Sequence, residues 1–188
     1  QILLADPAQS DANHNLGLIL CGRGEAEEGR ILLGRALASR PDVGQFWLDY
    51  VFGLARAELR EAGVRVAAVA RALGLKGPAL DALEAQLGAA PADRLPLDIE
   101  ALFAAGRFRE VEAIALALAL QQPGNGTLWG ILGAALHSQD RREDAFPFLQ
   151  KAAAAEPGNA RLAQVSAEIA RMPPPPEAIA RIDSLMTA

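Results

Sequence analysis

Few residues of this chain have the chemistry of a catalytic or metal-binding site. The 188 residues contain two histidines, His14 and His137, and one cysteine, Cys21. A single cysteine allows neither an intrachain disulfide nor a thiolate metal cluster, and the three residues do not form a metal-ligand or Cys–His pattern. Cys21 is therefore interpreted as a small apolar residue, buried or half-buried. We expect no metal site, no cofactor and no catalytic residue.

Two further segments contain residues that could do chemistry. The glycine-rich segment 21–29, C-G-R-G-E-A-E-E-G, lacks both the G-x-G-x-x-G spacing and the Lys-Ser/Thr ending of a phosphate-binding loop, so it is interpreted as a turn. The carboxylates of Glu25, Glu27 and Glu28, and of Glu110 and Glu112, are interpreted as solvated helix faces and as charges that a helix N-terminus favours. Neither segment predicts an enzyme.

The composition narrows the class of protein further. Hydrophobic residues make up 51% of the chain but aromatic residues only 5%, which favours close packing of Ala- and Leu-rich helices. The net charge of −5 argues against a nucleic-acid partner. The longest apolar run, residues 113–120, is too short to cross a membrane, and no signal peptide is evident. A cytoplasmic location is expected, and the missing initiator Met indicates a segment of a longer protein.

Residues 126–157 have the clearest repeat pattern. They place Trp, Leu-Gly, a bulky apolar residue, Ala, a second bulky residue, Ala and Pro in the order and spacing of a 34-residue helix–turn–helix unit. The pattern comprises Trp129, Leu132, Gly133, Leu136, Ala145, Leu149, Ala152 and Pro157.

Proline spacing extends this pattern over the chain. Pro7 and Pro41 are one repeat length apart, as are Pro123 and Pro157, whereas the separation of Pro41 from Pro123 exceeds two repeat lengths. Two arrays with one insertion between them account for this spacing. The resulting division is the end of a preceding repeat at 1–9, repeats at 10–43, 44–77, 92–125 and 126–159, an inserted short helix at 78–91, and capping helices with a proline-rich break at 160–188.

Several local features are expected from this division. A turn at residues 22–24 divides the first repeat, and the second helix of the second repeat runs from about Glu58 to Leu73. The inserted helix begins at Pro78 and ends near Gly88. Residues 113–120 alternate Ala and Leu but are predicted to be helical because Ala favours helix and the repeat register requires it.

Small residues are predicted where the two helices of a repeat cross. Gly17 is expected to face Gly29, Gly133 to face Ala145, and Gly63 to lie opposite Val51. The third repeat has Ile99 and Val111 at the crossing, so its helices are predicted to lie further apart.

These features resemble the tetratricopeptide repeat (TPR) family over nearly the whole chain. The resemblance implies an all-α fold, a right-handed α-solenoid of TPR helix–turn–helix repeats with one inserted helix. HEAT or armadillo stacking is the weaker alternative because those repeats are longer. In the TPR family the first helices line a concave groove that binds proteins or peptides. Carried over by repeat register, the groove candidates are Asp11, His14, Leu18, Gln45, Leu48, Phe52, Asp93, Glu100, Phe103 and His137.

The middle of the chain has a further resemblance. P-D-V-G-Q-F-W-L-D-Y (41–50) and L-F-A-A-G-R-F-R-E-V-E (102–112) resemble the N-terminal repeats of large bacterial TPR proteins that often carry a glycosyltransferase or sulfotransferase domain. The first hypothesis is a non-enzymatic scaffold that binds a protein or peptide in the groove. The alternative is the partner- or substrate-recruiting arm of such a transferase, whose catalytic domain would lie outside these residues. A third hypothesis is self-association through the open N-terminal edge.

Overall fold

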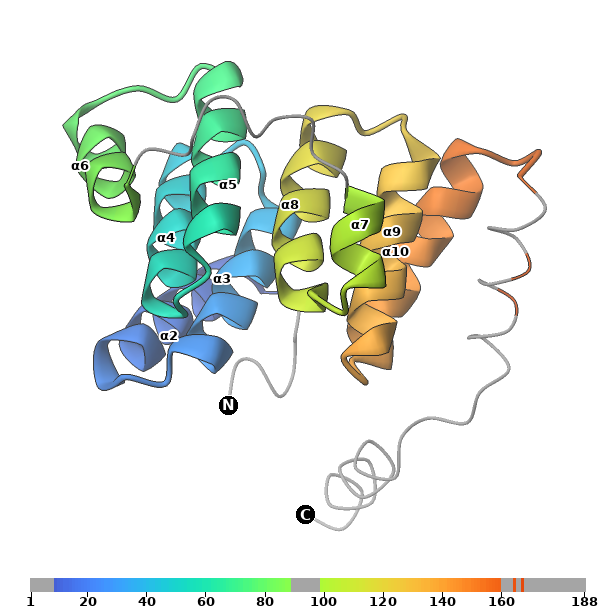
Figure 1. Ribbon diagram of the computed structural model, residues 1–188, viewed down its shortest axis with the longest axis horizontal. Coiled ribbons are helices and arrows are strands. Elements are labelled where there is room, and N and C mark those ends of the chain that lie inside the picture. Colours follow the sequence, from blue (N-terminus) through green and yellow to red (C-terminus); the bar gives the residue numbers. More distant parts are fainter. Residues whose placement is uncertain (1–8, 89–98, 160–163, 165–166, 168–188) are drawn as a thin grey trace, which may run out of the picture. The chain divides into compact units, whose positions relative to one another are not determined.

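A computed structural model describes residues 9–88, 99–159, 164 and 167 (Figure 1). Asp93 and most of the segment where capping helices are expected, 160–188, lie outside these residues. Within the described residues every regular element is a helix, which confirms the prediction of an all-α fold. The helices are α2 (Ser10–Arg23), α3 (Ala26–Ser39), α4 (Gly44–Arg56), α5 (Arg60–Ala72), α6 (Pro78–Leu87), α7 (Ile99–Ala104), α8 (Phe108–Gln121), α9 (Gly126–Ser138) and α10 (Arg142–Ala155).

The chain divides into two compact units, Gln1–Gly124 and Asn125–Ala188. The first unit contains α2 to α8, and the second contains α9 and α10. None of the described helices combines the length and the apolar character that crossing a membrane requires.

In the first unit, α2 and α3 form a tightly packed hairpin. A Cβ atom placed on Gly29 would lie 2.5 Å from Cys21 Sγ and 2.8 Å from the carbonyl oxygen of Gly17. The predicted crossing of Gly17 and Gly29 is therefore confirmed, and Cys21 is fully buried beside it. The turn is shorter than expected, since α2 continues through Arg23 and ends at Gly24, whose φ of 88° suits glycine.

The second hairpin, α4 and α5, differs from the sequence expectation at two points. Helix α5 begins at Arg60 rather than Glu58, because Glu58 has a left-handed backbone with φ 61°. Gly63 makes room for the inserted helix: a Cβ atom there would lie 2.9 Å from Leu87 Cδ2, and Val51 is not among its nearest neighbours. The small residue at position 63 thus allows α6 to approach α5.

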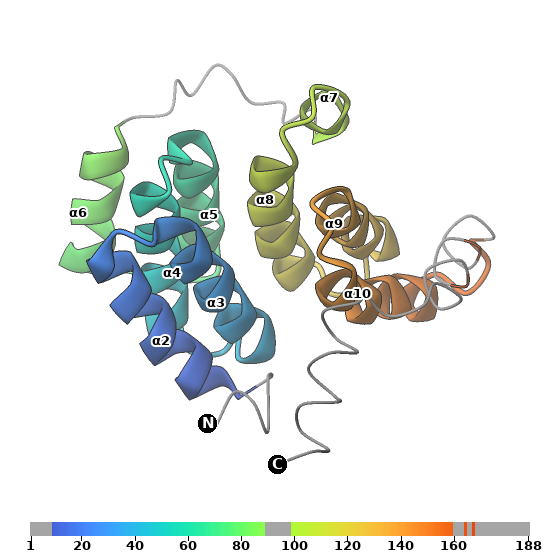
Figure 2. The ribbon, with the colours of Figure 1, turned by 90° about the horizontal axis from the view of Figure 1, so that it is seen from below.

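The predicted inserted helix is α6, which starts at Pro78 and buries Leu80 and Leu87. Arg71 of α5 secures it: Nη2 lies 2.7 Å from Asp81 Oδ1 and 2.5 Å from Glu84 Oε2. Helix α6 contacts α4 and α5, and it packs on the side of α5 opposite α8 (Figures 1 and 2).

Helix α8 is the most deeply buried helix of the first unit. It contacts α3, α5 and α7, and residues 111–117 are all buried. Residues 113–120 are apolar on every side of the helix, and such a segment needs these surroundings. The alternating Ala and Leu residues form a helix, as predicted. Helix α7 packs against α8, with the rings of Phe103 and Phe108 edge to face at 5.0 Å. The wider spacing expected where Ile99 and Val111 cross stays a prediction.

The second unit is the α9–α10 hairpin. A Cβ atom on Gly133 would lie 2.5 Å from Leu149 Cγ, so Leu149, rather than Ala145, is the side chain closest to this glycine. Near the start of α9, Glu156 Oε1 accepts a hydrogen bond from the backbone N–H of Thr127 at 3.0 Å. Asn125 caps the same helix through the N–H of Leu128. Because the first N–H groups of a helix lack intrahelical partners, these contacts stabilise the hairpin.

Candidate binding face on α2 and α4

The polar cluster that joins the first helices of two successive hairpins is centred on Asp49. His14 Nε2 of α2 lies 2.6 Å from Asp49 Oδ2 of α4, and Gln45 Nε2 donates a hydrogen bond to the same oxygen at 2.9 Å. The side chains of His14 and Asp49 are each 15% exposed. Both of these bonds are to Oδ2, and the carboxylate is thereby held in a fixed position with part of its surface accessible.

Local structure explains why these side chains meet. Gln45 and Asp49 are four residues apart and share one side of α4. The ring of His14 lies on that of Phe46, with centroids 4.7 Å apart, which orients its Nε2 atom. The N-terminus of α2 is secured by the buried Asn13, whose amide donates to the carbonyl oxygen of Gln9.

The other candidates on these two helices surround the cluster. Asp11 and Gln45 are exposed, whereas Leu18, Leu48 and Phe52 are half-buried. The α2–α4 face is the name used below for the surface formed by Asp11, His14, Leu18, Gln45, Leu48, Asp49 and Phe52.

Asp49 is absent from the candidates predicted from the sequence. Its position four residues after Gln45, on a helix expected to lie beside α2, was the available signal. Repeat register predicts Gln45, Leu48 and Phe52 on this helix but not Asp49, which bonds to His14.

Three predicted candidates lie on other elements. Glu100 is exposed and Phe103 half-buried on α7, the helix that packs against α8. His137 belongs to the second unit, near the end of α9, and its Nδ1 atom is shielded from solvent without a hydrogen bond in the described part of the chain. Within the first unit, Glu100 and Phe103 thus lie on a helix that packs against α8, and neither belongs to α2 or α4.

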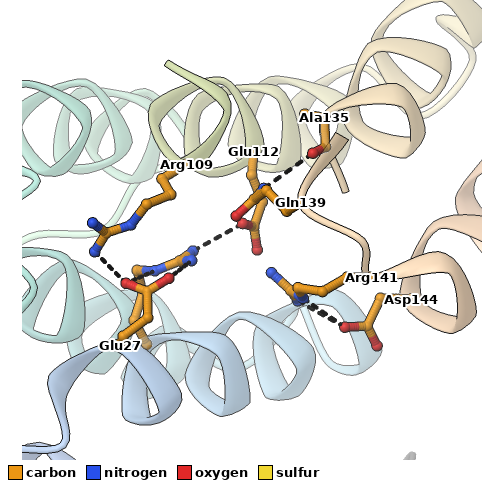
Figure 3. A network of polar contacts seen from close by, with 8 residues as sticks. Glu27, Arg109, Glu112, Ala135, Gln139, Arg141 and Asp144 are labelled. Carbon is orange, nitrogen blue, oxygen red and sulfur yellow. Dashed lines mark hydrogen bonds and ion pairs between the residues drawn. The ribbon is translucent and has the colours of Figure 1, made fainter. Parts of the chain in front are cut away.

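A second polar cluster, at the contact between α3 and α8, corrects the interpretation of Glu112 as a solvated residue (Figure 3). The side chain of Glu27 is 37% exposed and remains accessible to solvent. Arg30 is completely buried, and its Nη2 lies 2.5 Å from Glu27 Oε1 while its Nη1 lies 3.1 Å from Glu112 Oε2. Arg109 also pairs with Glu27. The buried charge of Arg30 is thus opposed by the buried Glu112 and by Glu27 at the edge of the contact, since a buried charge needs a partner of opposite sign. This cluster fastens α8 to α3.

The surroundings shift the pKa values of two members of this cluster in consistent directions. Burial alone would raise the pKa of the Glu27 carboxyl, but the hydrogen bond from Arg30 and the charges of Arg30 and Arg109 outweigh burial and lower it. Burial would lower the pKa of Arg30, but the charge of Glu112 and the hydrogen bond to Glu27 outweigh that effect and raise it. Glu27 and Arg30 are therefore both held in their charged forms.

The described residues provide no group of three His, Cys, Asp or Glu side chains that could hold a metal ion. Burial raises the pKa of the Cys21 thiol, with the charge of Arg56 opposing the shift only in part. A buried thiol with a raised pKa is unreactive, because the thiolate is the nucleophile. Cys21 is a packing residue, in agreement with its interpretation from the sequence.

Comparison with known proteins gives a likeness at the level of structure. No family model matches the chain, and no curated protein matches it. The crystal structure of YrrB, described as a TPR protein with an unusual peptide-binding site, is similar over 88% of this chain and 96% of that one, with 17% identity and a TM-score of 0.39. Nothing in these comparisons links the chain to glycosyltransferases or sulfotransferases.

The class of protein follows from the fold itself. Helices α2, α4 and α6 begin at positions 10, 44 and 78, so successive first helices start one TPR repeat length apart. Antiparallel hairpins with that period define a helical-repeat fold of the TPR type.

Proposed function

We propose that this chain is a non-enzymatic binding module that holds a peptide segment of a protein partner on the α2–α4 face. The observation that carries the proposal is the hydrogen bond between His14 and Asp49, which joins two successive first helices at the surface. Such a bond fixes the acceptor oxygens of Asp49 before any partner arrives. A preorganised polar group loses less conformational entropy on binding than a mobile one.

The chemistry of the face suits a peptide. A peptide backbone and its side chains offer N–H donors to the Asp49 carboxylate, and the half-buried Leu18, Leu48 and Phe52 offer apolar contact on either side. A few fixed polar groups among apolar side chains are typical of binding sites that combine affinity with orientation.

A phage-displayed library of random dodecapeptides, selected on the 188-residue chain, tests this proposal. We expect enriched peptides whose labelled synthetic forms lose binding to the Asp49→Asn variant by about tenfold or more in fluorescence anisotropy, as the loss of a hydrogen bond to a charged group predicts. His14→Ala is expected to weaken binding too, because it frees Asp49 to move.

Glu28→Gln is the control. Glu28 is an exposed carboxylate of α3 and belongs to neither of the helices that form this face. Binding to this variant should stay within twofold of the unmodified chain. Equal affinity of the unmodified chain and the His14 and Asp49 variants for every enriched peptide would overturn the proposal, as would failure to enrich any peptide.

A further inference from the structure

The inserted helix α6 has the packing of a first helix. It contacts α4 and α5 in the same way that α4 contacts α2 and α3. It also begins at position 78, one TPR repeat length after the start of α4. The buried residues agree with this register, because Leu80 and Leu87 correspond to Phe46 and Gly53, which are buried on α4. The row of first helices is therefore α2, α4 and α6.

The register identifies the residues of α6 that continue the α2–α4 face. Gln45, Asp49 and Phe52 on α4 correspond to Ala79, Leu83 and Gln86 on α6, with the same spacing of four and three residues. Ala79 and Gln86 are exposed and Leu83 is half-buried, so this side of α6 is open to a ligand.

The same register reveals a change in chemistry along the row. His14 and Asp49 form the polar pair between α2 and α4. The positions that correspond to them between α4 and α6 are Leu48 and Leu83, which are both apolar and half-buried. The first step of the row, between α2 and α4, thus offers a carboxylate. The next step, between α4 and α6, offers two leucines.

We infer that the face extends onto α6 and selects an extended peptide with a Lys or Arg at the α2–α4 step and an apolar side chain at the α4–α6 step. The cation is favoured by Asp49 and by the exposed Asp11 one turn before His14. Arg40, whose charge interacts with that of Asp11, forms an ion pair with Asp42.

The spacing of the helices predicts the spacing of the peptide motif. Packed helix axes lie about 10 Å apart, and an extended chain rises about 3.3 Å per residue. The basic and apolar residues should therefore be roughly three positions apart.

This inference rests on the proposed function, and the selected dodecapeptides test it with separate variants. We expect the enriched sequences to share a basic residue about three positions from a Leu, Ile, Val, Met or Phe. A labelled synthetic peptide with this motif should bind the Leu83→Glu and Ala82→Glu variants at least fivefold more weakly. Ala82 lies 34 residues after Leu48 of the α2–α4 face and is exposed, so its variant remains informative if Leu83→Glu unfolds.

Ala85→Glu is the control, because Ala85 is an exposed residue of α6 outside the Ala79–Leu83–Gln86 side and receives the same charge. Its affinity should stay within twofold of the unmodified chain. Peptides that depend on Asp49 but bind the Leu83 and Ala82 variants normally would overturn the inference and leave the proposed function intact. Peptides whose binding is insensitive to Asp49→Asn would contradict the proposed function instead. If Glu100→Gln or Phe103→Ala weakened peptide binding and the α6 variants did not, the face would continue onto α7 and the inference would be wrong.

Discussion

Glycine at position 29 lets α2 and α3 approach to a distance that no other residue permits. The nearest atoms to a Cβ at this position are Cys21 Sγ and the backbone of Gly17, and backbone cannot move aside as the end of a flexible side chain can. The approach buries Cys21 completely and brings Leu33 against Gly17. The absence of a side chain at position 29 therefore determines how closely α2 and α3 pack.

Replacement of this glycine should destabilise the protein. We expect Gly29→Ala to lower the free energy of unfolding by about 1–3 kcal/mol, because the added methyl overfills a packed interface. Urea denaturation monitored by circular dichroism measures the change.

Gly22→Ala is the matched control, since Gly22 also lies in a helix but has open space where the methyl would be. This variant should gain roughly 0.5–1 kcal/mol from the higher helix preference of Ala. A loss at Gly29 no larger than the effect at Gly22 would show that the close approach is unimportant.

At the scale of elements, the buried pair of Arg30 and Glu112, joined by Glu27, is the least expected feature. Removal of one partner from a buried ion pair typically costs about 3–5 kcal/mol because an uncompensated charge stays behind. We expect a loss of about this size for Arg30→Met, and a double-mutant cycle with Glu112→Met to show strong coupling between the two positions. If the two losses added to within about 0.5 kcal/mol, the pair would not be coupled.

The same cluster predicts a dependence of stability on pH. The folded pKa of Glu27 lies below its unfolded value, so its contribution is fully present above the unfolded pKa of about 4.3 and is lost as pH falls through the folded pKa. The difference in unfolding free energy between the unmodified chain and Glu27→Gln should therefore be largest near pH 7 and shrink below about pH 4.

Chemical denaturation at pH 7, 5, 4 and 3 measures this difference. Glu28→Gln serves as the control because Glu28 is exposed on the same turn of α3. A difference at Glu27 that stays constant across this pH range would contradict the assignment.

The sequence predicted the helices and hairpins more completely than the polar contacts between them. Repeat spacing and apolar pattern are local, so α8 and the hairpin turns could be predicted from short segments. The contact of Arg30 with Glu112 depends on α8 packing against α3. The two residues are far apart along the chain, and no sequence pattern predicts that they pair. Charged residues are mostly exposed in proteins, so the sequence predicts a solvated carboxylate at Glu112, whereas the structure buries it. On the α2–α4 face, His14 and Gln45 followed from repeat register, whereas Asp49 is identified by its contact with His14.

At the scale of the whole molecule, the outer face of α2 predicts self-association. Leu16 and Ile19 are 38% and 50% exposed. The corresponding residues of α4, Tyr50 and Gly53, are buried by α3 of the preceding hairpin. The exposed residues thus occupy positions that a repeat protein normally covers with a neighbouring helix.

We expect the 188-residue chain to associate at high concentration and Ile19→Glu to abolish the association. Size-exclusion chromatography with light scattering between about 10 μM and 1 mM measures this. Arg23→Glu, at an exposed residue one turn further along α2, tests whether the effect depends on apolar contact rather than on charge. A strict monomer over the whole range would refute this prediction.

The pairing of Arg30 with Glu112 also has a consequence for the order in which the chain folds. Hairpins of a repeat array form from contacts that are close in sequence and therefore form rapidly. This pair must close a loop that contains α4 to α7, which carries a greater entropic cost. Substitution of Glu112 should then accelerate unfolding and leave the folding rate nearly unchanged, with a φ-value close to zero, as for a contact that forms after the transition state.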